Sequence, residues 1–240
     1  MNDLLLLSNS TNVGRGYLDH AWDAVLPVLA GIEEIVFVPY ALADHDAYTA
    51  KVRDAFAAQG IAVRGVHEGA SPVQTVAEAA AVFVGGGNTF RLLDRVLGLG
   101  LDTALREHAA GGRPYLSASA GTNLAAPSIR TTNDMPIVFP GAFGALGLVP
   151  FQINCHFLDA DPASTHAGET RALRLTEYLE ENTTPVVALR EGAWIRGAGG
   201  RLSIGGQAVD AARGPALLFA RGSEPREIAG DITELVIGAD

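Results

Sequence analysis

The sequence predicts an α/β fold: a three-layer structure in which a mostly parallel sheet has helices on both faces, followed by a β-hairpin-rich C-terminal part. Short continuous apolar runs alternate with segments that carry apolar residues at helical spacing. Parallel strands are continuously apolar because helices cover both faces of their sheet. From Trp194 onward, alternating residues and glycine turns replace this pattern. Residues 1–240 contain no linker or internal repeat, so we expect a single domain.

The expected elements follow in chain order. We expect strands at Leu4–Leu7, Ile35–Val38, Ile61–Val66, Ala81–Val84, Pro114–Ser117, Gln152–Asn154 and Val186–Leu189. We expect helices at Leu18–Leu29, Ala43–Gln59, Val73–Ala80, Thr89–Val96, Leu101–Ala110, Thr122–Ala125 and Glu169–Glu181. Residues 128–150 fit neither pattern and are expected to be a long irregular segment, which inside a compact domain is more often functional than idle.

Composition narrows the function classes. The net charge of −10 disfavours nucleic acid as a partner, because an acidic surface repels phosphate backbones. Cys155 is the single cysteine, which excludes an intrachain disulfide and a cysteine-rich zinc site, and we expect no metal and no cofactor. The first residues lack the features of a signal peptide, and the apolar run Leu4–Leu7 is too short to cross a membrane. We expect a cytoplasmic protein, with a homodimer as one possibility.

A serine between small residues follows the strand at Pro114–Ser117. In Ser117-Ala118-Ser119-Ala120-Gly121 the chain passes from strand to helix, which is the pattern of a nucleophile elbow. We favour Ser119 over Ser117 as the nucleophile, because Gly121 stands two places after it and it lies at the bend. A loop without chemistry is the alternative interpretation of the same pattern.

A glycine turn, Gly85-Gly86-Gly87-Asn88, lies between an expected strand and an expected helix. Glycines let the backbone approach a ligand and direct N–H groups at it. We expect N–H groups of Gly86, Gly87 and Ala120 to form an oxyanion hole. The spacing matches neither dinucleotide-binding nor P-loop motifs, so a nucleotide site is disfavoured.

A nucleophilic serine needs a general base and an orienting acid. Among six histidines we favour His156, which follows a short apolar strand. His20, His45 and His108 lie in expected helices and are expected at the surface. Sequence reasoning leaves three acids open: Asp134, Asp159 and Asp161.

Several segments together carry a family resemblance. They are Leu6–Thr11, Val84–Phe90, Ser119–Gly121, Ile129–Val138, Gln152–Asn154, His156-Phe157, Gly168–Arg171 and Glu191-Gly192. In them the chain resembles the peptidase E family of serine peptidases, α-aspartyl dipeptidases related to cyanophycinase. The resemblance extends to about Gly206 and implies a fold like that of class I glutamine amidotransferases.

The resemblance also implies roles for individual residues. Ser119 matches the nucleophile, His156 the base and Asp134 the orienting acid of a Ser-His-Asp triad, and Glu191 matches an active-site glutamate. Ser117 stands where the family usually has glycine. The implied reaction is hydrolysis of small peptides after an N-terminal aspartate, typically Asp-X dipeptides.

Such a substrate carries a side-chain carboxylate and a free amine. The carboxylate calls for a guanidinium, for which we prefer Arg171 to Arg130, although Arg171 could instead pair with a glutamate on its own helix. Glu191 is the candidate for the amine, and Asn88 is a further candidate for substrate binding. Two alternative functions are a cyanophycinase-like exopeptidase acting on β-aspartyl peptides and a non-catalytic ligand-binding protein of the same fold. A glutamine amidotransferase is disfavoured, because those enzymes use an elbow cysteine and Cys155 lies elsewhere.

Overall fold

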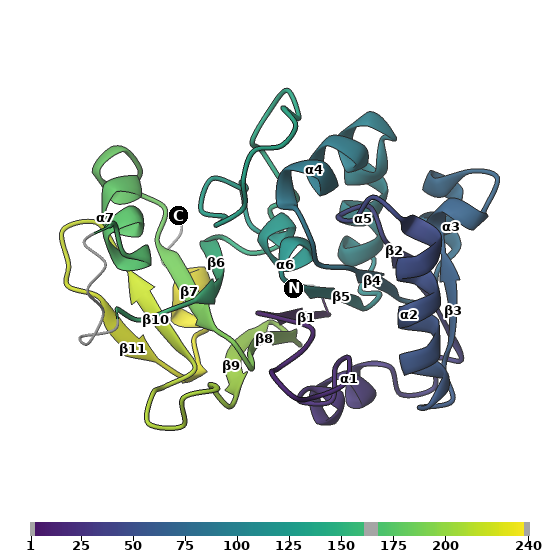
Figure 1. The fold of residues 1–240 in the computed structure, drawn as a ribbon, viewed down its shortest axis with the longest axis horizontal. Helices are drawn as coiled ribbons and strands as arrows, with labels where there is room; N and C mark the ends of the chain where they lie inside the picture. Colours follow the sequence, from purple (N-terminus) through teal and green to yellow (C-terminus); the bar gives the residue numbers. More distant parts are fainter. Residues whose placement is uncertain (1–2, 161–167, 238–240) are drawn as a thin grey trace.

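Two β-sheets form the framework of the computed structural model, which describes residues 3–160 and 168–237 (Figure 1). The first sheet has eight strands in the order β12-β9-β8-β1-β5-β4-β2-β3, and the second has four in the order β11-β10-β7-β6. The α/β class predicted from the sequence is confirmed. The strands divide between two sheets, however, whereas we expected one mostly parallel sheet.

The first sheet combines a parallel part with an antiparallel edge. Its strands are β1 (Leu4–Leu7), β2 (Glu34–Val38), β3 (Ala62–Gly65), β4 (Val82–Val84), β5 (Tyr115–Ala118), β8 (Ala193–Ala198), β9 (Arg201–Gly206) and β12 (Gly230–Asp231). The pairs among β1 to β5 are parallel, whereas β8 pairs antiparallel with β1, β9 with β8, and β12 with β9. The hairpin β8–β9 therefore occupies the edge beside β1.

The second sheet contains later strands of the chain. It contains β6 (Gln152–Phe157), β7 (Val186–Arg190), β10 (Ala216–Phe219) and β11 (Arg226–Ile228). Strands β6 and β7 are parallel, and β10 lies antiparallel between β7 and β11. Among the described strands, β6 is an edge strand that pairs only with β7, and β7 pairs with the C-terminal strand β10. The region after Gly206 thus contributes to both sheets.

Helices cover both faces of the parallel strands. Their bounds are α1 (Trp22–Val28), α2 (His45–Ala57), α3 (Pro72–Glu78), α4 (Thr89–Gly98), α5 (Leu101–Ala110), α6 (Ala120–Ala125), α7 (Arg171–Glu181) and α8 (Glu234–Ile237), with a 3-10 turn at Val66–Glu68. In Figure 1, α4, α5 and α6 lie above the strands and α1 lies below.

Alternate leucines of β1 show how these layers are held. Leu4 and Leu6 belong to a buried cluster with side chains of α4, α5 and α6. Leu5 and Leu7 belong to a second cluster with Val25 of α1. Successive strand residues point to opposite faces of a sheet, so the continuous leucine run serves two cores at once. The first cluster also includes side chains of the second sheet.

The first helix begins later than expected, β6 (Gln152–Phe157) is longer than the expected strand, and one helix was not expected. Leu18 has a φ of 61° and its N–H donates to the Ser10 carbonyl, so the helix expected from Leu18 begins only at Trp22. A short helix, α8, closes a region for which only β structure was expected. The long segment between α6 and β6 contains no helix or strand among its described residues, as expected, apart from an isolated bridge between Ser128 and Gly144.

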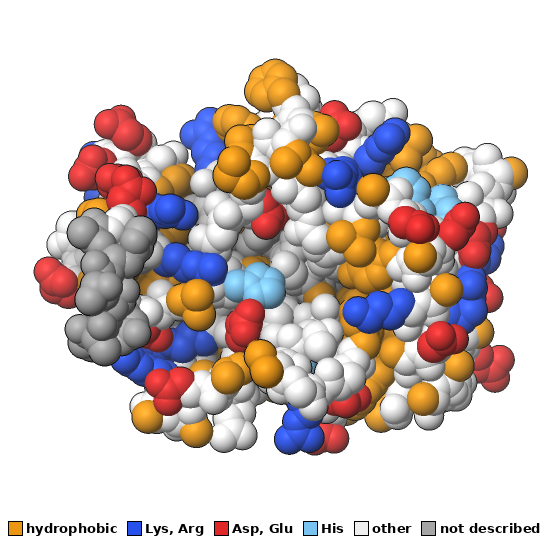
Figure 2. Space-filling view, viewed as in Figure 1, with side chains coloured by type: hydrophobic (Ala, Val, Ile, Leu, Met, Phe, Trp, Pro, Cys, Tyr) orange, Lys and Arg blue, Asp and Glu red, His pale blue; other side chains and the backbone are white. Residues whose placement is uncertain are grey.

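This segment also carries exposed apolar side chains. Met135, Ile137 and Phe139 are 74%, 51% and 75% exposed. Figure 2 shows hydrophobic side chains gathered at the top of the molecule, where Figure 1 draws the segment. None of the helices in residues 3–160 and 168–237 has the length and apolar character required to span a bilayer.

Candidate active site

The site begins where the parallel strands end. Leu7 of β1 is in register with Ala118 of β5, and Val84 of β4 with Ser117. The carboxyl ends of these strands therefore meet at one edge, and the segments that follow them converge there. This is the usual ligand edge of an α/β sheet.

Ser119 occupies the turn between β5 and α6. Its φ of 53° and ψ of −110° are rare for a residue other than glycine, and such strain collects at functional sites. Its N–H donates to the Leu7 carbonyl at 3.0 Å, which ties the turn to the adjacent strand. A Cβ at Gly121 would collide with the carbonyl of Val84, so the position two places on must remain glycine. The strand–turn–helix geometry predicted around Ser119 is present.

Ser117 has a different environment. Its side chain is fully buried, and its hydroxyl bonds to Thr122 Oγ1 at 2.9 Å. Thr122 Oγ1 in turn donates to the Leu7 carbonyl at 2.7 Å. Ser117 therefore links strand and helix inside the core, away from solvent.

His156 lies next to Ser119 although it belongs to the second sheet. Its Nε2 is 2.8 Å from Ser119 Oγ. The β6–β7 register shifts between Asn154 and Phe157, and His156 has a φ of 54°. A bulge of this kind redirects a side chain. The backbone N–H of His156 donates to Ser8 Oγ, which anchors β6 to the loop after β1.

Glu191 holds the other side of the imidazole. Its Oε1 is 2.7 Å from His156 Nδ1. Glu191 follows β7 and precedes Gly192, which has a φ of 87° and whose Cβ would collide with the carbonyl of Gln207. The Gly192 N–H donates to Asn9 Oδ1 at 2.8 Å, so the loop after β1 also fixes this turn. In the neutral ring, Nδ1–H donates to the carboxylate and Nε2 accepts from the serine hydroxyl.

Asp134 does not contact the imidazole. Its Oδ2 accepts from the N–H and the hydroxyl of Thr89, at 2.7 and 2.6 Å, and from Thr132 Oγ1 at 3.2 Å. A carboxylate at a helix N-terminus satisfies free N–H groups and the helix dipole. The hydrogen bond to His156 that we expected of Asp134 is made by Glu191. Asp134 instead holds the start of α4 beside the glycine turn.

The candidate acid Asp159 is engaged by an arginine. Asp159 accepts from Arg190 at 2.7 and 2.9 Å, and these bonds lower the pKa of its carboxyl group. Asp161 lies outside the described residues. Of the histidines expected at the surface, His108 is fully buried, with Nε2 bonded to the Pro114 carbonyl at 3.0 Å.

The glycine turn provides fewer free donors than expected. The N–H of Gly86 donates to the Tyr48 hydroxyl at 2.9 Å and is not available to an oxyanion. Gly87 has a φ of 134°, and a Cβ there would lie 2.6 Å from the Ala41 carbonyl. Within residues 3–160 and 168–237, no hydrogen bond from the N–H of Gly87 or Ala120 is found. The two donors left for an oxyanion hole are thus Gly87 and Ala120.

The turn itself is held by tyrosines. The Tyr48 hydroxyl, which accepts from Gly86, lies 3.4 Å from the Tyr17 hydroxyl. Burial raises the pKa of both phenols, so both stay neutral at physiological pH. Sequence reasoning missed both residues because they come from α2 and from the loop before α1, far along the chain from the turn. No local motif marks them.

The three residues predicted to bind the substrate differ in how many of their hydrogen-bond donors are available to a ligand. Among the described residues, Nη1 of Arg171 is buried and has no hydrogen-bond partner. Burial lowers the pKa of Arg171, and the nearby Glu191 carboxylate opposes that shift. Arg130 lies over the ring of Phe143, at 5.9 Å from its centroid. Asn88 caps α4 through Oδ1 and donates through Nδ2 to the Met135 carbonyl at 2.8 Å, which leaves one amide hydrogen for a ligand.

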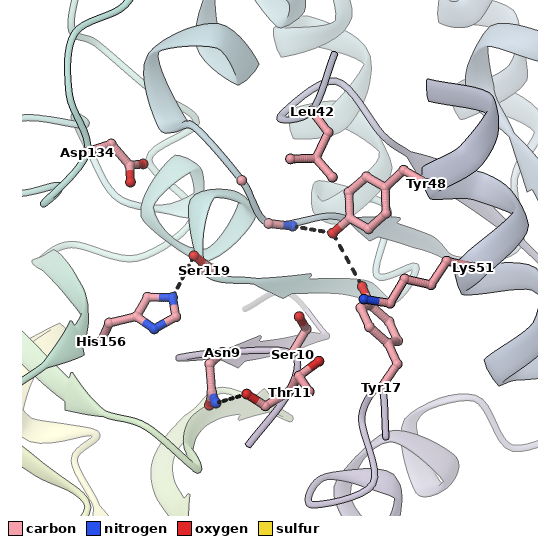
Figure 3. A pocket seen from close by; sticks show the side chains of 12 residues that line it. Asn9, Ser10, Thr11, Tyr17, Leu42, Tyr48, Lys51, Ser119, Asp134 and His156 are labelled. Atoms are coloured by element: carbon pink, nitrogen blue, oxygen red, sulfur yellow. Dashed lines mark hydrogen bonds between the residues drawn. The ribbon is translucent and has the colours of Figure 1, made fainter. Parts of the chain in front are cut away.

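A cavity of about 400 Å³ opens beside the serine (Figure 3). Its lining comes from the loops after β1, β2 and β4, from α2 and the elbow, from the segment between α6 and β6, and from β6 itself. The lining residues are Asn9, Ser10, Thr11, Tyr17, Leu42, Tyr48, Lys51, Gly86, Gly87, Ser119, Asp134 and His156. Figure 2 shows a histidine side chain near the centre of this face, with acidic and basic side chains beside it. In the described part of the chain, no group of three or more His, Cys, Asp or Glu side chains could hold a metal ion.

A hydroxyl, an imidazole and a carboxylate in series, beside free backbone N–H groups at a helix start, define a site of the serine-hydrolase class. The sequence comparisons identify the family. Peptidase family S51 matches residues 4–205, and the chain belongs to this family.

Individual relatives agree. The chain is 59% identical to "Peptidase E" of Streptomyces coelicolor over 98% of this chain and 95% of that one. It is 49% identical to "Probable alpha-aspartyl dipeptidase" of Drosophila melanogaster, over 81% and 82% of the two chains. Among solved structures, a putative peptidase E protein from Listeria monocytogenes matches with a TM-score of 0.62 at 19% identity, over 87% of this chain and 100% of that one. At that identity the match shows the shared fold.

Proposed function

We propose that this chain is a serine dipeptidase that hydrolyses peptides with an N-terminal aspartate, through an acyl-enzyme on Ser119. One observation carries the proposal: His156 makes two hydrogen bonds in series. Its Nε2 lies 2.8 Å from Ser119 Oγ, and its Nδ1 lies 2.7 Å from Glu191 Oε1. The names of the relatives, peptidase E and probable alpha-aspartyl dipeptidase, support the substrate class.

In the first half of the reaction, Ser119 Oγ attacks the carbonyl carbon of the N-terminal aspartate and His156 Nε2 takes its proton. The carbonyl oxygen becomes an oxyanion, and the N–H groups of Gly87 and Ala120 stabilise it. His156 then protonates the leaving nitrogen, and the second residue departs as a free amino acid. Water, activated by His156, hydrolyses the aspartyl ester and restores the serine.

Glu191 takes the orienting role in this proposal, and Asp134 takes a positioning role. Glu191 fixes the ring so that Nε2 faces the serine. Its Oε2 has no hydrogen-bond partner among the described residues, and we assign it to the substrate amine. Asp134 orients α4 and the glycine turn through Thr89. The proposed triad is therefore Ser119, His156 and Glu191.

Arg171 is our candidate for the side-chain carboxylate of the substrate. A buried guanidinium nitrogen without a partner in the described residues is costly, and an incoming carboxylate would satisfy it with paired N–H donors. Asn88 remains a secondary candidate through its remaining amide hydrogen.

The test of the reaction is a dipeptide panel. Purified protein is incubated with Asp-Leu, isoaspartyl-Leu and Ala-Leu, and free leucine is measured. We expect release from Asp-Leu alone. Release mainly from isoaspartyl-Leu would favour the β-aspartyl exopeptidase, and no release from any of the three would favour the non-catalytic alternative.

The recognition of aspartate is tested by exchanging one charge at a time. Arg171→Met should lower kcat/KM for Asp-Leu about 100-fold, as for a charged hydrogen bond lost at a half-buried site. The same change should matter little for Asn-Leu. Arg174→Met is the matched control, because Arg174 lies on the same helix and pairs with Glu169 at 3.3 Å. Equal losses with both substrates would remove the assignment of Arg171.

We also propose that the chain forms one domain over residues 1–240, works in the cytoplasm and pairs as a homodimer. The single cysteine suits a reducing compartment, and the net charge of −10 suits a partner other than nucleic acid.

The exposed side chains of Met135, Ile137 and Phe139 support a second copy of the chain as the partner. Light scattering should give twice the chain mass and, for Phe139→Glu, the mass of one chain. A single-chain mass for the unaltered protein would exclude the dimer.

A further inference from the structure

One cationic side chain lines the cavity on the side away from the imidazole. Lys51 of α2 lies beside Tyr17, whereas His156 lies across the cavity next to Ser119 (Figure 3). Its ammonium is 5.2 Å from the centroid of the Tyr17 ring. A cation over an aromatic face is weakly stabilised and keeps its N–H donors for another acceptor.

Lys51 differs chemically from the other cations of the chain. It is the only lysine in the sequence, and every other cationic side chain among the 17 Lys and Arg residues is an arginine. In residues 3–160 and 168–237 no carboxylate lies within ion-pair distance of it, whereas Arg53 on the same helix pairs with Glu68 at 2.9 Å. The ammonium that faces the cavity is thus not neutralised by any described neighbour.

The cavity is the part of the site left for the leaving residue. Arg171 and Glu191, which we assign to the N-terminal aspartate, are not among its lining residues in the described chain. Leu42 supplies an exposed apolar side chain to the same cavity. An apolar second residue can pack on Leu42 while its free carboxylate turns toward the ammonium.

We propose that Lys51 binds the free α-carboxylate of the leaving residue and so selects dipeptides over longer peptides. This inference rests on the proposed Asp-X peptidase function and adds the chemistry of the leaving side. In a dipeptide the terminal carboxylate lies within about one residue length, roughly 3.5 Å, of the scissile nitrogen. In a longer peptide, a neutral peptide carbonyl occupies that position. The flexible four-carbon stem lets the ammonium follow carboxylates of different residues.

The aromatic neighbour limits the cost of ordering the lysine. Tyr17 is tethered through its hydroxyl to Tyr48, which also holds Gly86. The ammonium is therefore positioned by the same tyrosine pair that fixes the glycine turn. Lys51 is thus connected to the glycine turn through a cation–π contact with Tyr17 and the hydrogen bonds of Tyr48.

The first experiment compares Asp-Leu with Asp-Leu-amide, which lacks only the terminal charge. The unaltered protein should favour the free acid in kcat/KM by about 5- to 10-fold, as for a solvent-accessible ammonium–carboxylate hydrogen bond. Lys51→Met should bring this ratio to about 1, and Lys51→Arg should keep most of it. Arg53→Met removes a cation from the same helix and should leave the ratio unchanged.

The second experiment uses the single lysine. Acetylation removes the charge of Lys51 and modifies the chain terminus, whereas reductive dimethylation keeps the positive charge. Acetylation should abolish the preference for the free acid in the unaltered protein but not in Lys51→Arg, and dimethylation should preserve it.

The outcomes separate this inference from the proposed function. If Asp-Leu is cleaved but the free-acid preference is absent, survives Lys51→Met or is lost on dimethylation, the Lys51 assignment is wrong and the peptidase proposal stands. If neither Asp-Leu nor its amide is cleaved, both fail together.

Discussion

The carboxylate that orients the imidazole can be identified by replacing it with an uncharged amide of the same shape. Glu191→Gln keeps the size and shape of the side chain but removes the charge facing His156 Nδ1, 2.7 Å away. The amide can turn its NH₂ group toward Nδ1, which then has to accept, and this tautomer leaves a proton on Nε2. An imidazole in that tautomer cannot take the serine proton.

The expected fall in kcat depends on how far the side chains of His156 and Glu191 are exposed to solvent. For a buried triad aspartate, the equivalent change costs about 10⁴-fold in kcat. Here the side chains of His156 and Glu191 are 36% and 34% exposed, so water offsets part of the loss. We expect kcat for Asp-Leu to fall about 100- to 1,000-fold, or about 3 to 4 kcal/mol in the activation barrier.

Asp134→Asn is the matched comparison. The asparagine oxygen can still accept from Thr89 at the start of α4, so kcat should fall by less than about 10-fold while the free energy of unfolding drops by about 1 kcal/mol. Steady-state kinetics and urea unfolding of the two variants are sufficient. If Asp134→Asn lowers kcat more than Glu191→Gln does, the orienting role belongs to Asp134 and not to Glu191.

Three further predictions concern other parts of the site and the core. Ser119→Ala should lower kcat by at least about 10⁴-fold with an unchanged melting temperature, whereas Ser117→Ala should keep most activity and lose about 1 kcal/mol of stability; the opposite result would move the nucleophile. Tyr48→Phe leaves the buried N–H of Gly86 without its acceptor, so we expect a loss of about 1 to 3 kcal/mol in urea unfolding and a fall in kcat of about 10-fold, and an unaffected enzyme would show that the phenol does not hold the turn. Burial lowers the pKa of His108 below its ordinary 6.5, so the unfolded chain binds the proton more readily and the free energy of unfolding decreases as the pH falls below about 6.5. His108→Gln lacks this titration, so the difference in the free energy of unfolding between the unaltered protein and His108→Gln should become smaller from about pH 7 to pH 5. A difference that stays constant over this range would contradict the prediction.

Much of the local structure followed from short sequence patterns. The run Leu4–Leu7 and the strand before Ser119 were predictable because buried parallel strands are continuously apolar. The elbow was predictable because only small residues fit two places from the serine, and Gly121 does lie against Val84. The family resemblance, carried by motifs across the chain, is confirmed by the match to Peptidase family S51 over residues 4–205.

The position of the carboxylate beside the imidazole depended on long-range pairing. Asp134 and Glu191 both stand in family motifs, and nothing local distinguishes their partners. Strand β7 pairs with β6, which brings the residue after β7 to His156, while Thr89 and Thr132 engage Asp134. A strand register cannot be derived from either segment alone.

The sequence by itself predicted the α/β class, the turn at Ser119, the choice of His156 and the family, because local apolar patterns and short motifs along the chain carry these predictions. The tertiary structure alone decided three contacts: Glu191 with His156, Tyr48 with Gly86, and Lys51 with the ring of Tyr17. In each of these, the two partners come from elements that meet only through sheet pairing or helix packing. A hydrogen bond requires atoms within about 3 Å, and that distance is set by how the whole chain folds.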